Sequence, residues 1–136
     1  MKKHQRTLID YRLMEARESL EEARVLLREK MSNRSVTNRL YYAMFYAVLA
    51  ILQDKQISSS KHSGIIAVFD REFVKKKIFD KKLSKALHRA FELRQKGDYM
   101  EHTVISDSDV EELMLMTTDF LYAAEKFCLA KDDSMK

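Results

Sequence analysis

The chain contains no proline and only two glycines, Gly64 and Gly97, among its 136 residues. A β-sandwich or β-barrel needs many tight turns, and such turns are built largely on these two residue types. The same scarcity excludes a glycine-rich phosphate loop and a dinucleotide-binding fingerprint, which need several glycines at fixed spacing. The chain must therefore consist of long elements with few tight turns, and its length corresponds to about one domain.

Hydrophobic residues recur at spacings of three and four from Leu8 to about Lys30, which predicts one long amphipathic helix. A second helix is predicted from about Arg34 to Asp54, after N-cap candidates in residues 32–35. Its thirteen residues from Leu40 to Leu52 include no charged residue. Since a membrane span needs about 18 apolar residues or more, this stretch is expected to be the buried centre of a soluble helical protein.

Two shorter helices are expected in the middle of the chain. The third has an apolar face and ends at the three lysines of residues 75–77, where positive charge favours the helix dipole. Asp80 is an N-cap candidate for the fourth helix, and Gly97 can close that helix in the left-handed conformation.

Residues 98–106 are expected to form a loop, and Ser108 with Glu111 can form the capping box of a last helix. The predicted fold class is all-α, a five-helix up-and-down antiparallel bundle. We expect one domain over residues 1–136, with its core in about residues 8–130.

Charge is distributed unevenly along the chain, whose formal net charge is +4. Residues 1–60 carry +4, residues 61–96 carry +7 and residues 97–136 carry −7. These charged residues can simply form the solvent-exposed faces of the helices. The middle segment, with Lys75, Lys76 and Lys77, can instead form a basic surface for RNA or another polyanion.

The residue types that serve most often as metal ligands or nucleophiles are few. The histidines are His4, His62, His88 and His102, and no two of them share a helix at metal-ligand spacing. Cys128 is the only cysteine, so no internal disulfide can form, and a buried inert thiol is expected. We therefore expect no metal and no cofactor. The charged N-terminal segment indicates no signal peptide, so a cytoplasmic location is expected.

The segment from Asn38 to Ala47 carries the most information about function, because Arg39 opens an otherwise apolar helix. Arg39, Tyr42 and Tyr46 share one helix face, since seven residues make almost two turns. A guanidinium in this position needs a carboxylate, a partner chain or an anionic ligand. A buried ion pair with an aromatic packing seam is the structural alternative.

This segment resembles the motif helix of HEPN-domain proteins, in which Arg precedes Tyr-Tyr-Ala, Phe and then His. The segments 61–64 (Lys-His-Ser-Gly) and 91–99 (Phe-Glu-Leu-Arg-Gln-Lys-Gly-Asp-Tyr) resemble the same branch of the family, so that the resemblance covers about residues 8–130. It implies a small helical module, often a homodimer, often encoded beside a minimal nucleotidyltransferase in a toxin–antitoxin pair.

In active members of the family, the Arg and the His act together as a metal-independent ribonuclease site across the dimer. Arg39 matches the Arg, but Tyr46 occupies the position of the His. An unperturbed tyrosine titrates near pH 10 and is a poor general base at neutral pH. The resemblance thus implies catalytic positions at Arg39 and Tyr46, and a nucleotide- or RNA-binding set. That set comprises Asn38, Arg39, Tyr42, Lys61, His62 and Arg94.

Three functional interpretations follow. The first is a nucleotide- or RNA-binding interaction module that partners a minimal nucleotidyltransferase in a toxin–antitoxin-like pair. The second is a metal-independent endoribonuclease that uses Arg39, with Tyr46 or His62 in the proton-transfer role. The third is a purely structural helical adaptor.

Overall fold

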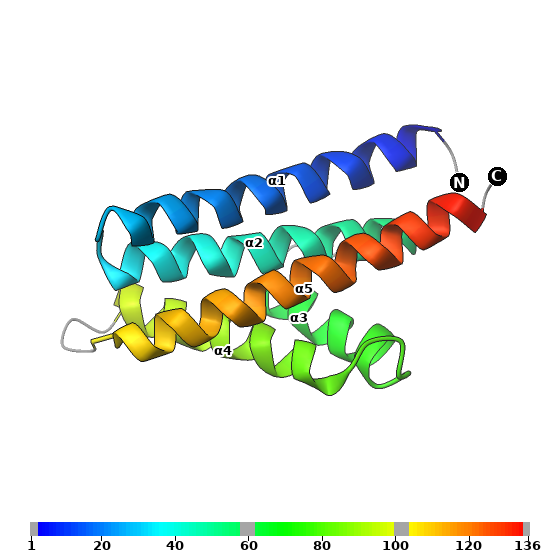
Figure 1. The fold of residues 1–136 in the computed structure, drawn as a ribbon. Coiled ribbons are helices and arrows are strands. Elements are labelled where there is room, and N and C mark those ends of the chain that lie inside the picture. Colours follow the sequence, from blue (N-terminus) through cyan, green and yellow to red (C-terminus); the bar gives the residue numbers. More distant parts are fainter. Residues whose placement is uncertain (1–2, 58–61, 100–103, 135–136) are drawn as a thin grey trace.

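The computed structural model describes residues 3–57, 62–99 and 104–134, and these residues form α-helices and one π-helical turn without any strand (Figure 1). The elements are α1 (Lys3–Arg28), α2 (Asn33–Asp54), α3 (His62–Phe69), η1 (Asp70–Val74, the π-helical turn), α4 (Lys81–Tyr99) and α5 (Asp107–Ser134). The predicted all-α class is confirmed. None of the helices in these ranges is long and apolar enough to cross a membrane.

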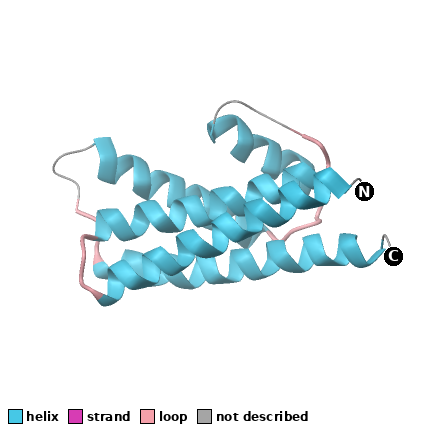
Figure 2. Cartoon of the chain, turned by 90° about the horizontal axis from the view of Figure 1, so that it is seen from above, coloured by secondary structure: helices cyan, strands magenta, loops and turns pink. Residues whose placement is uncertain are grey.

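Helix α2 is the centre of the bundle, because it contacts α1, α3, α4 and α5. Helices α1, α2 and α5 lie side by side along the length of the molecule, and α3 and α4 lie on another side of α2 (Figures 1 and 2). The start of α1 lies beside the end of α5, where the Arg6 guanidinium donates to the backbone oxygen of Cys128 at 2.9 Å.

The apolar stretch of α2 is buried as predicted, except along one side. Ten of its thirteen residues are buried, and Tyr42, Tyr46 and Leu49 are half-buried. These three residues follow Arg39 at helical spacing. We call this row, Arg39, Tyr42, Tyr46 and Leu49, the open side of α2, because the neighbouring helices do not cover it fully.

Two predicted N-caps are confirmed and one is wrong. The Ser32 hydroxyl accepts from the Ser35 N–H at the start of α2, and the Asp80 carboxylate accepts from the Lys82 N–H at the start of α4. Helix α5 begins two residues earlier than Ser108 predicts, because Ser106 accepts from the Asp109 N–H at 3.0 Å. Ser108 therefore lies inside the first turn of α5.

The predicted role of Gly97 is also wrong. Gly97 lies inside α4, which continues to Tyr99, and no glycine of the described residues has a positive φ. A glycine inside a helix costs about 1 kcal/mol relative to alanine. A Cβ at this position would lie 3.0 Å from Arg34 Cγ and 3.1 Å from Ile105 Cδ1. Gly97 therefore allows Arg34 and Ile105 to approach α4 closely.

A buried glutamine joins α1 to the C-terminal end of α2. The Gln5 amide donates to the backbone oxygens of Gln53 and Asp54, at 2.9 and 3.1 Å, and its own oxygen accepts from Gln56. The last carbonyl groups of a helix have no partner within the helix. Gln5 thus donates to the Asp54 carbonyl and adds a second donor to the Gln53 carbonyl, which also accepts from the Gln56 N–H at 3.0 Å.

We predict that Gln5→Ala lowers the free energy of unfolding by about 1–3 kcal/mol, because it removes the buried hydrogen bonds that join α1 to the end of α2. Urea denaturation followed by circular dichroism measures the loss. Thr7→Ala is the control, because the exposed Thr7 hydroxyl donates only to the Lys3 carbonyl of its own helix. Equal losses in the two variants would contradict this role of Gln5.

Candidate functional site

Arg39 lies on the open side of α2, and its guanidinium is held by two neighbours. Nε and Nη2 donate to Asn38 Oδ1 at 3.2 and 2.7 Å, and Nη1 lies 3.7 Å from Glu22 Oε1 of α1. The Arg39 side chain is 30% exposed and the Glu22 side chain 58%. The ion pair proposed as the structural alternative thus exists, but it is not buried. Such an accessible pair contributes about 0–1 kcal/mol to stability.

The backbone beneath Arg39 is fixed more firmly than its side chain. Ser19 of α1 is buried, and its hydroxyl donates to the Arg39 backbone oxygen at 2.8 Å. Helix α1 therefore holds the start of the open side in a defined position while the guanidinium stays accessible to a ligand.

The ring of Tyr42 contacts two cations from different helices. The Arg39 guanidinium lies 5.2 Å from the centroid of this ring, and the Arg94 guanidinium of α4 lies 5.3 Å from it. Arg94 also lies 5.1 Å from the ring of the buried Tyr41, whose pKa burial raises to about 12. These distances are within the range of cation–π attraction. The structure thus brings Arg39, Tyr42 and Arg94 together.

Tyr46 continues the row one turn further along α2, with its ring centroid 5.9 Å from that of Tyr42. Burial is the main cause that raises the pKa of Tyr46, and the Glu15 carboxylate adds to this shift, whereas Arg39 opposes it. Tyr46 therefore stays protonated at neutral pH. It can donate a hydrogen bond, but it cannot act as a general base at that pH.

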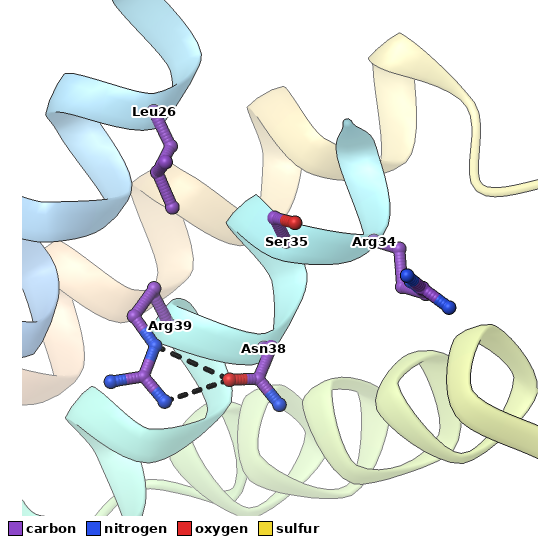
Figure 3. Close-up of a pocket in the computed structure, with 5 residues that line it drawn as sticks. All are labelled: Leu26, Arg34, Ser35, Asn38 and Arg39. Atoms are coloured by element: carbon purple, nitrogen blue, oxygen red, sulfur yellow. Dashed lines mark hydrogen bonds between the residues drawn. The ribbon is translucent and has the colours of Figure 1, made fainter. Parts of the chain in front are cut away.

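A surface pocket of about 530 Å³ lies beside Arg39 (Figure 3). Its lining residues are Leu26 of α1 and Arg34, Ser35, Asn38 and Arg39 of α2. Figure 3 shows Arg34 and Arg39 on two sides of Asn38, extending in different directions. The pocket lies at the first turns of α2, where the helix dipole favours an anion.

Three residues of this region were not predicted from the sequence: Arg34, Ser35 and Glu22. For Arg34 a signal did exist, because it lies in the first turn of α2 and that turn has no acidic residue. A cation at a helix N-terminus is disfavoured by the dipole, so this arginine does not serve the stability of its helix. Glu22 carries no such signal, since its contact with Arg39 depends on how α1 packs against α2.

Two residues of the predicted binding set are not described by the structure. Lys61 lies outside the described residues, and His62 begins α3 with a side chain that lies outside the described part.

The lysines of the predicted basic surface lie far from Arg39. Residues 75–77 precede α4, and the helix rise puts its first residue, Lys81, about 20 Å from Arg94. Lys76 pairs with Glu72 at 2.7 Å, which reduces its share in any anion site.

His88 and Cys128 have contacts that explain them without a ligand. His88 Nε2 lies 2.5 Å from Asp70 Oδ2, and the Ser84 hydroxyl donates to Asp70 Oδ1, so that η1 is fastened to α4. Cys128 is fully buried, and burial raises its pKa to about 12, as an inert thiol requires. Among the residues that the structure describes, no three His, Cys, Asp or Glu side chains are grouped as a metal site.

Comparison with known proteins places these observations in a family. The model of the HEPN domain matches residues 9–127. A UPF0332 protein of Thermotoga maritima is 43% identical, over 88% of this chain and 89% of its own length. A protein of Methanocaldococcus jannaschii named "Putative toxin" is 33% identical over 86% of this chain and 79% of its own length. A second protein of that organism with the same description is 30% identical, over 82% and 77%. With a family match over most of its length, the chain belongs to the HEPN domain family.

Proposed function

We propose that the chain is a nucleotide- or RNA-binding interaction module of a toxin–antitoxin-like pair, and that the pocket beside Arg39 receives phosphate. One observation carries the proposal: Arg39 and Arg94 approach the ring of Tyr42 from α2 and α4, next to a pocket at the start of α2. Membership of the HEPN family and the two relatives that carry the name "Putative toxin" support it.

The chemistry of these groups suits a phosphate ester with a base attached. A guanidinium binds phosphate oxygens with two parallel hydrogen bonds, and it keeps its charge at every physiological pH. Aromatic rings beside such cations are the usual stacking partners of unpaired bases in RNA. Tyr42 and Tyr46 are half-buried, so part of each ring is accessible to a base.

The purely structural adaptor is less well supported. A structural arginine on a buried helix is expected to be covered by its carboxylate partner. Arg39 is instead accessible, and its pair with Glu22 has a distance of 3.7 Å. An interaction this weak leaves the guanidinium available for exchange with another anion.

The endoribonuclease is the second candidate, and the state of Tyr46 argues for weak or absent cleavage. Cleavage by an internal 2′-hydroxyl needs removal of a proton, and general acid–base help contributes about 10²–10⁴-fold. Tyr46 occupies the position that His holds in active members, and its raised pKa keeps it protonated. A general base is therefore missing at this position. We therefore propose binding as the main activity of the wild-type chain.

We also propose a second copy of the chain and a minimal nucleotidyltransferase as partners, and a cytoplasmic location. The open side of α2 supports the dimer, because Tyr42, Tyr46 and Leu49 expose apolar area beside the pocket. A homodimer formed there would place two Arg39 side chains near one axis.

We predict that Arg39→Gln weakens binding of a single-stranded RNA oligonucleotide by about tenfold or more, since a hydrogen bond to a charged group contributes about 1.5–3 kcal/mol. Fluorescence anisotropy at fixed salt measures the affinity. Arg24→Gln is the matched control, because Arg24 is an exposed arginine of α1 that pairs only weakly with Glu21, at 3.5 Å. If the control loses as much affinity, the binding is nonspecific attraction to positive charge.

Tyr46→His is expected to gain or increase RNA cleavage, because an imidazole supplies the missing base at neutral pH. The assay is run in EDTA with the wild type beside it, and the added substitution Arg39→Ala should abolish the gain. Strong cleavage by the wild type that does not respond to Arg39→Ala would show that the site lies elsewhere, and His62 would be the next candidate.

Glu22 is expected to compete with the ligand for Arg39, since its carboxylate already lies near Nη1. Glu22→Gln should tighten RNA binding about two- to fivefold, the size of a surface ion pair. Glu21→Gln removes the same charge from the neighbouring position of α1, where Glu21 pairs with Arg24. An equal gain in both variants would mean that only the net charge of α1 matters.

A further inference from the structure

We infer that Arg34 is a second anion-binding residue of the pocket and that Gly97 holds it in place, so that the site takes two linked phosphates. The inference rests on the proposed function, because it extends the same pocket. It narrows the ligand from any phosphate to a group with two phosphates in sequence, as in an oligonucleotide or a diphosphate.

The two arginines stand at opposite sides of one pocket. Arg34 and Arg39 are five residues apart in α2, so that their backbone positions lie about 7.5 Å apart along the helix axis and about 140° apart around it. Ser35 and Asn38 line the pocket between them (Figure 3). Because the two side chains extend in different directions, with polar side chains between them, they suit two phosphates better than one.

Arg34 differs from Arg39 in its charge partners within the part of the chain that the structure describes. Arg39 lies near Glu22, whereas no carboxylate of the described residues lies within ion-pair distance of Arg34. Its charge also opposes the dipole of α2, in whose first turn it lies. No carboxylate of the described residues thus accounts for a cation here, and an anionic ligand would.

Gly97 explains how the exposed Arg34 side chain obtains a defined position. Its stem crosses α4 at Gly97, where an added Cβ would lie 3.0 Å from Arg34 Cγ and 3.7 Å from Cδ. Such contact would require the stem to move by a few tenths of an ångström. Glycine weakens a helix interior, so its presence in α4 is accounted for by the room that it gives to Arg34 and Ile105. Gly97 is therefore a positioning residue and does not itself touch the ligand.

The test is a double-mutant cycle of Gly97→Ala and Arg34→Gln, with calorimetry and anisotropy as readouts. The probes are a short single-stranded RNA, inorganic pyrophosphate and inorganic phosphate. Arg34→Gln should lower the affinity for RNA or for pyrophosphate about tenfold, and the affinity for phosphate less than twofold. In the wild-type background, Gly97→Ala should lower the affinity for the same probe several-fold. In the Arg34→Gln background, it should leave that affinity unchanged. A thermal melt of each variant checks that it is folded.

The outcomes separate the inference from the function on which it rests. If Arg34→Gln loses affinity for RNA, the ligand is a pair of consecutive phosphodiesters. If it loses affinity for pyrophosphate alone, the ligand is a free diphosphate. Either result supports two linked phosphates. Arg34→Gln with wild-type affinity for both probes, while Arg39→Gln is weakened, overturns the inference and leaves the proposed function standing. An unaffected Arg39→Gln variant overturns the proposed function itself. If Gly97→Ala does not fold, Arg34→Lys replaces it in the test. Full affinity in that variant overturns the inference that the Arg34 guanidinium binds phosphate with two parallel hydrogen bonds.

Discussion

The burial of α2 on every side but one is the constraint on which the rest of the structure depends. Four helices pack against it, and its apolar residues supply the centre of the core. A charged side chain on the remaining side needs a partner or access to solvent, because the helix is otherwise buried. It carries Arg39 at its start and the rings of Tyr42 and Tyr46 behind it, and these groups remain partly accessible.

The site combines firm backbone placement with weak side-chain contacts. Ser19 and the N-cap at Ser32 fix the start of α2, and Gly97 lets α4 approach it. The guanidinium of Arg39, by contrast, is held by Asn38 and by the Glu22 carboxylate at 3.7 Å, and phosphate oxygens could take the place of both contacts. An anion can therefore enter without moving the helices.

Local pattern was enough to predict most of the fold. The spacing of apolar residues identified every α-helix, and Ser32 and Asp80 were recognised as caps because a cap is a contact within a few residues. The start of α5 was misplaced because Ser106 and Ser108 are both suitable caps, and the sequence does not distinguish them. Gly97 was misread because glycine serves either a left-handed backbone or a close approach, and only the neighbouring Arg34 decides between them.

The candidate site was predictable only in part, for a similar reason. Helical spacing placed Tyr42 and Tyr46 beside Arg39. The residues from other elements depend on packing between helices. Arg94 was named through the family resemblance alone, and Glu22 and Arg34 were missed. The three lysines of residues 75–77, prominent in the sequence, belong to a distant part of the bundle.

The most direct test of the central claim is a nuclear magnetic resonance titration of the arginine Nε–Hε signals with a short single-stranded RNA. We expect the Arg39 signal to shift first, as phosphate takes the place of the contacts with Asn38 and Glu22. The signal of Arg17, which pairs with Glu125 of α5, should stay in place. An Arg39 signal that does not move while that of Arg71 beside the distant lysines shifts would contradict the account.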